Sequence, residues 1–264
     1  MVVMPSASDL DVALAAARAG GDVALRHYAT LADLPRELKA DGSVVTAADR
    51  ESEEAIRAVL ARERPGDAIL GEEGGATGAG SRRWILDPID GTASFVSGDD
   101  RWLVLVAIED GGEMVAGVAA IPAMDQVWWA TRGGGAYCAR LDGTQQRRVT
   151  VGADRPAALA GSTVGVIPAL PNYLESDRLA AAPLVARATE TAWELHAGLL
   201  VADGRLDLAV QTRGQLWDFA ATSLIVTEAG GVYGGSDGIR GPRPGASLFA
   251  RDETLWKAAH DVLF

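Results

Sequence analysis

The chain has 264 residues with 48% hydrophobic and 23% charged side chains, a composition that excludes a disordered protein and allows one large domain or two modest ones. Its formal net charge of −12 argues against nonspecific binding to nucleic acid or to an anionic membrane, because either would require a basic face. No apolar run reaches membrane-spanning length, Cys138 has no second cysteine to pair with, and no basic-then-apolar leader opens the sequence, so we expect a cytoplasmic protein.

Two helices and a short strand are predicted in the first third of the chain. An alanine-rich amphipathic pattern runs from Asp9 to about Leu31, and Ala47–Arg62 forms a second one. Ala68–Leu70 reads as a buried strand that ends in two adjacent acids, Glu72 and Glu73. We expect both helices to cover one face of a sheet, and the adjacent carboxylates to need something that neutralises them.

The next apolar run, Trp84–Leu86, predicts a strand that ends at Asp87, because Pro88 fixes φ and removes a backbone donor. Asp87 and Asp90 lie three residues apart, so a turn can aim both carboxylates into one space. Carboxylate oxygens are the ligands that Mg²⁺ prefers. A surface loop is the alternative, since Asp-Pro and Asp-Gly are ordinary turn dipeptides.

Gly91 and Thr92 follow directly and suit an anion. Gly91 has no Cβ, so the backbone can approach a ligand closely, and the amides of both residues can point at phosphate oxygens. This segment therefore combines candidate cation ligands with candidate phosphate donors.

An antiparallel meander is predicted next, with strands at Trp102–Ile108, Met114–Ile121 and Gln126–Thr131. Trp128-Trp129 would place one ring on each face of its strand, which favours packing over ligand stacking. Arg132 lies close to these rings and is a candidate substrate contact.

The polar stretch Arg140–Arg148 predicts a boundary between two sub-domains, which we place at residues 1–145 and 146–264. Beyond it, strands and helices alternate, which predicts layered α/β packing. Strands are expected at Thr163–Ile167 and Leu206–Val210, and helices at Leu179–Ala188, Ala192–Ala202, Phe219–Ala229 and Asp252–Leu263. Asp218 stands where the N-cap of the third of these helices would be.

Three acidic segments thus border apolar elements: Glu72-Glu73, Asp87 with Asp90, and Asp218. Each has a structural explanation of its own. Their combination is better explained by one shared cation site.

These segments resemble the inositol monophosphatase superfamily of Mg²⁺-dependent phosphomonoesterases. The resemblance rests on motifs in the family's order and covers nearly the whole chain: Lys39-Ala40-Asp41 with Val45–Arg50, Gly71-Glu72-Glu73, Trp84–Thr92, Val201–Asp207, and Trp217-Asp218 with Glu228–Gly231. Within the superfamily, Trp128–Ala136 looks most like actinobacterial histidinol-phosphate phosphatases. The resemblance implies an α/β fold of the α+β two-sub-domain kind, a five-layer α-β-α-β-α sandwich with the metal site between its halves. It also implies a homodimer.

By matching position, the resemblance implies two or three Mg²⁺ ions. One would be held by Glu72, Asp87 and the Ile89 carbonyl, and a second by Asp87, Asp90 and Asp218. A third, looser ion would lean on Glu72.

The resemblance also implies that Thr92, coupled to Asp49, orients and deprotonates the attacking water while the Gly91 and Thr92 amides hold the phosphate. Glu73 would orient ligands from outside, and Lys39 would supply nearby positive charge. Since no Cys or His nucleophile candidate is visible, metal-activated water is the expected nucleophile.

Some of these helpers have ordinary explanations. Asp49 lies near the start of a helix, where an acid favours the helix dipole, and Lys39 is also typical of a solvated surface residue. His27, His196 and His260 show no metal-ligand spacing, and we interpret them as packed or helix-surface residues.

The chain departs from the family where substrate is selected. Gln211 stands seven residues before Asp218, where the family commonly has a glutamate that binds hydroxyl or amino groups. Trp193 and Glu194 stand where it usually has Gly and a small or acidic residue, and Ala93 replaces a frequent Lys or Asn. We expect Gln211, Glu194 and Asp218 to contact substrate, with Glu194 receiving an ammonium group.

That expectation keeps histidinol phosphate ahead of inositol phosphate, with a phosphorylated amino sugar or aminonucleoside as a third possibility. Two other classes remain open at this point. One is a catalytically silent metal-binding scaffold, although no ligand is lost. The other is a two-metal nuclease, although no Lys/Arg run supplies the basic groove its substrate needs.

Overall fold

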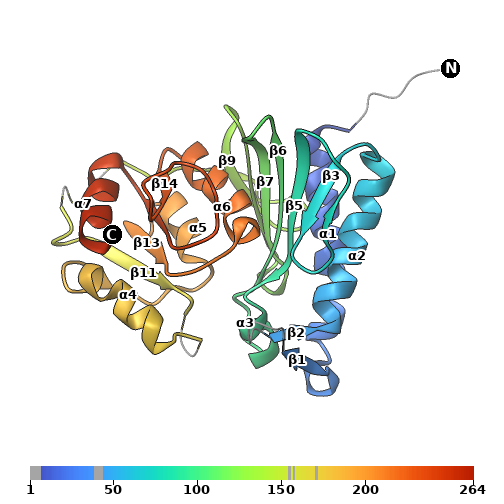
Figure 1. Ribbon diagram of the computed structural model, residues 1–264, viewed down its shortest axis with the longest axis horizontal. Helices are drawn as coiled ribbons and strands as arrows, with labels where there is room; N and C mark the ends of the chain where they lie inside the picture. The colour runs from blue at the N-terminus through green and yellow to red at the C-terminus, as the bar shows by residue number, and fades with distance from the viewer. Residues whose placement is uncertain (1–6, 39–43, 154–155, 157, 170–171) are drawn as a thin grey trace.

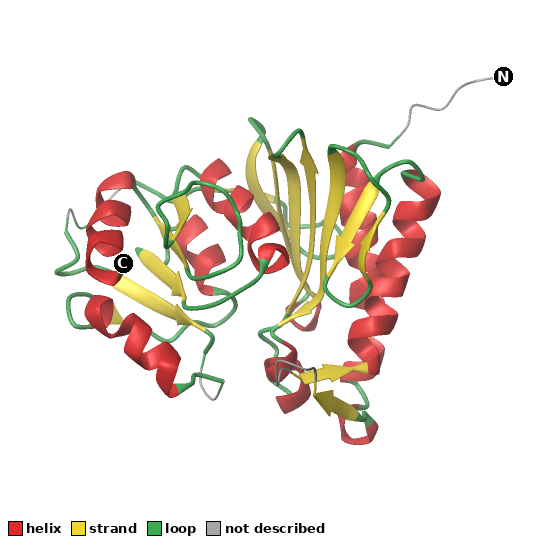
Figure 2. Ribbon diagram, in the orientation of Figure 1, coloured by secondary structure: helices red, strands yellow, loops and turns green. Residues whose placement is uncertain are grey.

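The computed structural model describes residues 7–38, 44–153, 156, 158–169 and 172–264, and these form five layers in the order helices, sheet, helices, sheet, helices (Figure 1). Figure 2 shows the two yellow sheets separated by red helices and covered by further helices on their outer faces. The predicted α-β-α-β-α sandwich is confirmed.

The first layer is a pair of long helices, α1 (Asp9–Tyr28) and α2 (Ala47–Glu63), both close to their predicted bounds. Thr46 caps α2, and its backbone and hydroxyl both donate to Asp49 in the first turn. A Cβ on Gly20 of α1 would come within 2.8 Å of Ile56 of α2, so glycine is what allows the two helices to pack this closely.

Eight strands of the described residues form the first sheet, in the order β10-β9-β8-β7-β6-β5-β3-β4. Their bounds are β3 (Ala68–Gly71), β4 (Gly75–Thr77), β5 (Arg82–Asp90), β6 (Leu103–Asp110), β7 (Glu113–Ile121), β8 (Gln126–Thr131), β9 (Gly135–Ala139) and β10 (Arg147–Val149). The antiparallel meander is confirmed, because β6, β7 and β8 pair in sequence order. β10 pairs with β9, so this sheet reaches Val149, while our division of the chain at residue 145 stays a prediction.

The prediction that the β5 strand ends at Asp87 is wrong. Asp87 pairs with Leu105 of β6 and Asp90 with Leu103, so three steps along β5 match two along β6. One extra residue in a strand is a β-bulge, where Pro88 is tolerated without a donor. Residues three apart in a regular strand point to opposite faces, and the extra residue therefore brings Asp87 and Asp90 to the same face.

The two faces of the first sheet belong to different cores. Trp84, Leu86 and Trp129 pack in the core under α1 and α2, whereas Leu105 and Trp128 pack in the core shared with the middle layer. The two tryptophans of β8 thus face opposite sides, as predicted. Asp87 and Asp90 share the face of their β6 partners and so point toward the middle layer.

The middle layer contains α5 (Ala197–Ala202) and α6 (Leu216–Glu228). α6 is buried on nearly all sides because it lies between the two sheets. Two predictions are corrected here. α5 begins at Ala197 rather than Ala192, and the N-cap of α6 is Gln215, so Asp218 lies in its first turn, where its carboxylate accepts the Gln215 N–H at 2.9 Å.

Five strands of the described residues form the second sheet, in the order β12-β11-β13-β15-β14. They are β11 (Thr163–Ile167), β12 (Thr189–Glu190), β13 (Leu208–Gln211), β14 (Val232–Gly235) and β15 (Ser247–Ala250), and α4 (Glu175–Val185) and α7 (Glu253–Leu263) cover the outer face. β14 and β15 were not predicted, and β14 ends in Gly234-Gly235, which is typical of a turn.

The remaining elements are short: η1 (Leu31–Asp33), the β1–β2 ribbon (Arg36–Leu38 and Val44–Thr46), α3 (Thr92–Ser97) and η2 (Pro122–Met124). Across the described ranges, no helix is both long enough and apolar enough to cross a membrane.

Candidate metal centre

Three carboxylates converge where the first sheet meets the middle layer. Asp87 and Asp90 come from the β5 bulge and Asp218 from the first turn of α6. One carboxylate oxygen of each lies within 4.8 Å of the others. The structure thus brings together acids from both halves of the chain, as the sequence led us to expect.

Burial disfavours the charged form of all three carboxylates of this cluster. Burial raises the pKa of Asp87 and of Asp90 well above the ordinary range, and the neighbouring carboxylates raise both further. Burial, with Glu72 adding, raises the pKa of Asp218 to about 6 although the Gln215 amide opposes the rise. Oxygen donors that repel one another in a buried site fit a bound divalent cation, which removes the repulsion.

Glu72 is the fourth acid of the centre. β3 runs parallel to β5 with Gly71 paired to Leu86, and the Glu72 amide donates to the Leu86 carbonyl at 3.2 Å. Glu72 therefore lies beside Asp87, and its charge raises the pKa of Asp49, Asp87, Asp90 and Asp218 alike.

The turn that carries Glu72 is held by a residue that the sequence analysis missed, Glu53 of α2. Its carboxylate accepts the Glu73 amide at 2.7 Å and the Gly74 amide at 2.9 Å, and Arg57 donates to it at 2.6 Å. A Cβ on Gly71 would lie 2.2 Å from the Glu53 carboxylate, so glycine is required there. The available signal was an acid on the buried, apolar face of an amphipathic helix.

Asp49 and Thr92 lie together, as expected. The Thr92 hydroxyl is 3.1 Å from Asp49 Oδ1 and also 3.1 Å from the Ile89 carbonyl. The other Asp49 oxygen accepts both the amide and the hydroxyl of Thr46 at 2.7 Å. Burial raises the pKa of Asp49 against the opposing effect of these hydrogen bonds. Asp49 thus caps its helix with one oxygen and contacts Thr92 with the other.

Gly91 links the bulge to α3 in a left-handed conformation, with φ of +87°. A side chain there would be strained, and its Cβ would lie 3.3 Å from the Arg101 carbonyl. Glycine therefore leaves the backbone of Gly91 and Thr92 uncovered by a side chain at this position.

Trp193 forms part of the contact between the two halves. Arg101 donates to the Trp193 carbonyl at 3.0 Å, and its guanidinium lies 5.0 Å from the centre of the indole ring. The indole N–H donates to the Val166 carbonyl at 3.0 Å. This contact could not be predicted from the sequence, because Arg101 and Trp193 are 92 positions apart.

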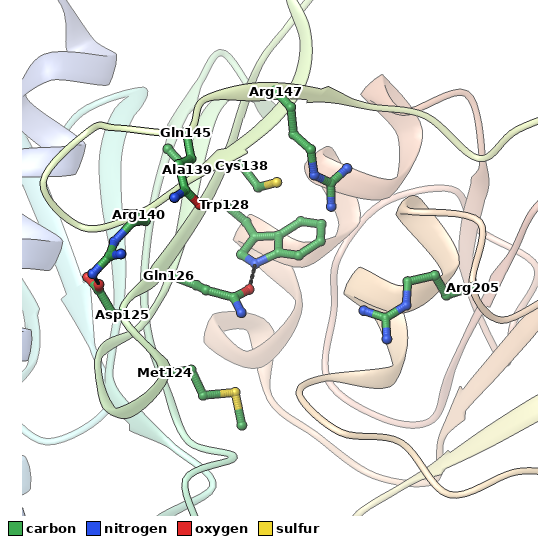
Figure 3. A pocket seen from close by; sticks show the side chains of 10 residues that line it. All are labelled: Met124, Asp125, Gln126, Trp128, Cys138, Ala139, Arg140, Gln145, Arg147 and Arg205. Carbon is green, nitrogen blue, oxygen red and sulfur yellow. Dashed lines mark hydrogen bonds and ion pairs between the residues drawn. The ribbon is translucent and has the colours of Figure 1, made fainter.

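Glu194, the next residue, is exposed and forms an ion pair with Arg205. Arg205 comes from the segment after α5 and faces Gln126 and Trp128 across a surface cavity of about 520 Å³ (Figure 3). Three arginines line this cavity, Arg140, Arg147 and Arg205, and none of the predicted metal ligands does. The carboxylate we expected to meet an ammonium group is therefore already paired with a cation.

Gln211 lies at the end of β13 and is 4% exposed. Its Oε1 atom is buried without a hydrogen-bond partner among the described residues.

Arg132 lies far from the metal centre. It donates to the Met114 carbonyl at 3.1 Å and pairs with Glu113 at 3.0 Å. The register places Thr131 level with Trp84, about 20 Å along β5 from Asp90. The structure thus contradicts a substrate contact for Arg132. Lys39 lies outside the described residues.

Comparisons with known proteins agree with this geometry. Residues 7–250 match the model of the inositol monophosphatase family. A histidinol-phosphatase of Mycobacterium tuberculosis is 36% identical over 92% of this chain and 93% of its own, and an inositol-1-monophosphatase of Mesorhizobium japonicum is 36% identical over 94% and 93%. The solved structure of the extragenic suppressor protein suhB from Bartonella henselae superposes with a TM-score of 0.81 at 29% identity, covering 96% of this chain and 97% of that one.

Proposed function

The chain belongs to the inositol monophosphatase family of metal-dependent phosphatases, and from this premise we propose that it is a Mg²⁺-dependent enzyme that hydrolyses a small-molecule phosphate ester by metal-activated water. The observation that carries the proposal is the cluster of Asp87, Asp90 and Asp218, whose oxygens lie within 4.8 Å of one another. The raised pKa values of these acids support it, because a cation would relieve their repulsion.

Glu72, Asp87, the Ile89 carbonyl, Asp90 and Asp218 would hold two or three Mg²⁺ ions. When bound, the ions would supply positive charge that partly neutralises the phosphate dianion and lowers the pKa of the attacking water, so that it loses a proton more easily.

Thr92 and Asp49 move the proton in this proposal. The Thr92 oxygen accepts a proton from the attacking water while its own hydroxyl proton passes to Asp49 Oδ1, 3.1 Å away. Burial raises the pKa of Asp49, which makes its carboxylate a better proton acceptor. The Gly91 and Thr92 amides donate to the phosphate oxygens, where negative charge must be stabilised.

We propose histidinol phosphate, hydrolysed to histidinol, as the first candidate substrate, with Glu194, Gln211 and Asp218 contacting the leaving group. A relative named histidinol-phosphatase supports this choice. Inositol monophosphate is the second candidate, supported by a relative of the same identity, and an amino-sugar or aminonucleoside phosphate is the third. If histidinol phosphate is the substrate, the enzyme acts in histidine biosynthesis. We also propose that it is a cytoplasmic protein and a homodimer.

The test is phosphate release from a panel containing histidinol phosphate, inositol 1-phosphate, an amino-sugar phosphate and p-nitrophenyl phosphate, with Mg²⁺ and with EDTA. We expect Mg²⁺-dependent release, fastest with histidinol phosphate, and no cleavage of DNA. Comparable turnover of inositol 1-phosphate would remove the histidinol preference. Equal release in EDTA would contradict the metal-dependent mechanism.

A further inference from the structure

The surface cavity of about 520 Å³ has a charge opposite to that of the chain as a whole (Figure 3). The sequence contains 36 acidic and 24 basic residues. The residues that line the cavity, by contrast, include three arginines, Arg140, Arg147 and Arg205, and one acid, Asp125. A cleft lined by charge of one sign concentrates ions of the opposite sign. The cavity is therefore suited to an anion.

Two of these arginines reach the cavity from different halves of the molecule. Arg147 belongs to β10 of the first sheet, and Arg205 follows α5 of the middle layer. Figure 3 shows both guanidinium groups reaching toward the Trp128 ring. The Arg147 guanidinium lies 5.7 Å from the centre of that ring. An anion held by Arg147 and Arg205 would thus contact both halves.

Arg147 is held in place by a carboxylate that lies deeper in the structure. Its two terminal nitrogens donate to Asp203 Oδ1 at 2.6 Å and to Asp203 Oδ2 at 2.8 Å. The Asp203 side chain is 11% exposed, whereas that of Arg147 is 50% exposed. A guanidinium has five N–H donors, so this pair fixes Arg147 and leaves it further donors for a ligand.

Arg205 is less firmly held. Its partner is Glu194, and the side chains of Arg205 and Glu194 are 45% and 62% exposed. Exposed ion pairs of this kind stabilise a protein little, because water and salt screen them. A phosphate group, which matches the fork of a guanidinium, can therefore compete with Glu194 for Arg205.

Gln126 adds a further donor to the cavity. The indole N–H of Trp128 donates to Gln126 Oε1 at 3.2 Å. An indole nitrogen can only donate, so the amide oxygen must face it, and the NH₂ group of Gln126 remains as a donor. Guanidinium and NH₂ groups accept no hydrogen bonds, which favours a ligand group rich in acceptors. A phosphate dianion has three acceptor oxygens and no donor.

The cavity is separate from the metal centre. Trp128 pairs with Ala119 of β7, which pairs with Leu105 of β6. Leu105 pairs in turn with Asp87 of β5. The intervening strand spacings amount to about 14 Å, too far for one phosphate group to contact both places. None of the predicted metal ligands lines the cavity.

We propose that this cavity is a second ligand site, which binds a small organic phosphate without a metal ion. Arg147 and Arg205 hold the phosphate group, and the organic part lies along Gln126. The two guanidinium groups supply the positive charge that Mg²⁺ would supply at the metal centre. The inference goes beyond the proposed function and does not depend on it.

The experiment is isothermal titration calorimetry of the full chain in EDTA with glucose 6-phosphate and glycerol 2-phosphate. Glucose and glycerol are the matched ligands without phosphate. EDTA silences the metal centre, whose acids repel a phosphate group when no cation is bound. The variants are Arg205→Gln and Arg147→Gln. Arg132→Gln is the matched control, because it removes the same charge from an exposed ion pair outside the cavity.

At least one of the two phosphates is expected to bind the parent in EDTA, and glucose and glycerol are not. Arg205→Gln and Arg147→Gln should each weaken binding about 10-fold or more, as expected for the loss of a hydrogen bond to a charged group. Arg132→Gln should bind as the parent does. Thermal unfolding shows which variants are folded, and Arg205→Gln should be, because it breaks only an exposed pair.

The inference would be overturned if neither phosphate binds the parent, or if glucose or glycerol binds as tightly as its phosphate. An unchanged affinity in folded Arg205→Gln would also overturn it, because the phosphate would then be bound elsewhere. The proposed function is tested apart from this, by Mg²⁺-dependent phosphate release. A chain that releases no phosphate would overturn the proposed function and leave the result in EDTA as it is.

Discussion

The two halves of the molecule carry opposite kinds of buried polar group. The first sheet and the helix α2 that covers it supply acidic side chains, and hydrogen bonds from neighbouring elements organise these acids: Glu53 holds the turn that carries Glu72, and Thr46 holds Asp49 of α2. The second sheet carries neutral groups, Gln211 and Ser247 among them, with buried atoms that have no hydrogen-bond partner in the described part of the chain.

The two kinds of polar group differ in charge, and we expect substitutions among them to have different effects. Acids that repel one another need a cation whatever the substrate is, so the first sheet specifies the chemistry. Neutral buried groups do not repel one another in this way and call for no cation. Changes on the two sheets should therefore have different consequences.

The largest effect is expected on the first sheet. Asp90→Asn removes one negative ligand, and we expect kcat to fall at least about 1,000-fold, because transition-state charge stabilisation depends on the cation. Far-ultraviolet circular dichroism should be unchanged. Asp22→Asn, on the exposed side of α1, is the matched control and should keep parental activity. Near-normal turnover by Asp90→Asn would remove Asp90 from the ligand set.

A smaller loss is expected when proton transfer alone is disturbed. Thr92→Ala should lower kcat by about 100-fold or more, the usual contribution of a general base, while Mg²⁺ binding measured by calorimetry stays within a few-fold of the parent. Thr92→Ser keeps the hydroxyl 3.1 Å from Asp49 and should recover most of the activity. If serine recovers none, Thr92 acts through packing rather than through its hydroxyl.

The third prediction concerns pH, metal and stability. The folded-state pKa of Asp218 is about 6 against an ordinary 3.8, so ionising Asp218 costs the metal-free fold stability as pH rises through that interval. Mg²⁺ binds the ionised carboxylates and should raise the midpoint of thermal unfolding more at pH 7.5 than at pH 5. At a concentration 100-fold above the Kd the stabilisation is about 2.7 kcal/mol. An equal shift at both pH values, or an unchanged pH dependence in Asp218→Asn, would contradict this account.

The smallest effect is expected at the exposed ion pair between Glu194 and Arg205. If Glu194 binds an ammonium group, Arg205→Gln should free it and lower KM for histidinol phosphate by up to about 5-fold, as expected for an exposed ion pair. Arg132→Gln, which breaks a similarly exposed pair with Glu113, is the control. A raised KM in Arg205→Gln would show that Arg205 itself assists binding.

The convergence of Asp87, Asp90 and Asp218 could be predicted from sequence, because acids that border apolar elements are conspicuous and their combination favours one shared site. Alternating helical and strand patterns predicted layered α/β packing in the second half of the chain, whereas the five-layer order was implied by the family resemblance. The predicted end of β5 was wrong, because a proline normally stops a strand. Here Pro88 lies in a β-bulge, and this bulge brings Asp87 and Asp90 to the same face of the sheet.

The strands of the second sheet were harder to predict from the sequence. β14 and β15 were not recognised as strands, so Tyr233 and Ser247 could not be assigned to a face. His196 was interpreted as a packed or helix-surface residue, and it is packed, but only the structure shows that neither ring nitrogen has a hydrogen-bond partner among the residues it describes. The contact of Arg101 with Trp193 joins distant segments and leaves no local pattern.

The most direct test of the central claim is a crystal soaked with Mn²⁺, whose anomalous scattering locates the ion in place of Mg²⁺. Anomalous peaks are predicted among the carboxylates of Asp87, Asp90 and Asp218, and they should be lost in Asp218→Asn with Asp87 and Asp90 still in place. A fully soaked crystal with no peak between these residues, or with Mn²⁺ bound only elsewhere, would contradict the account.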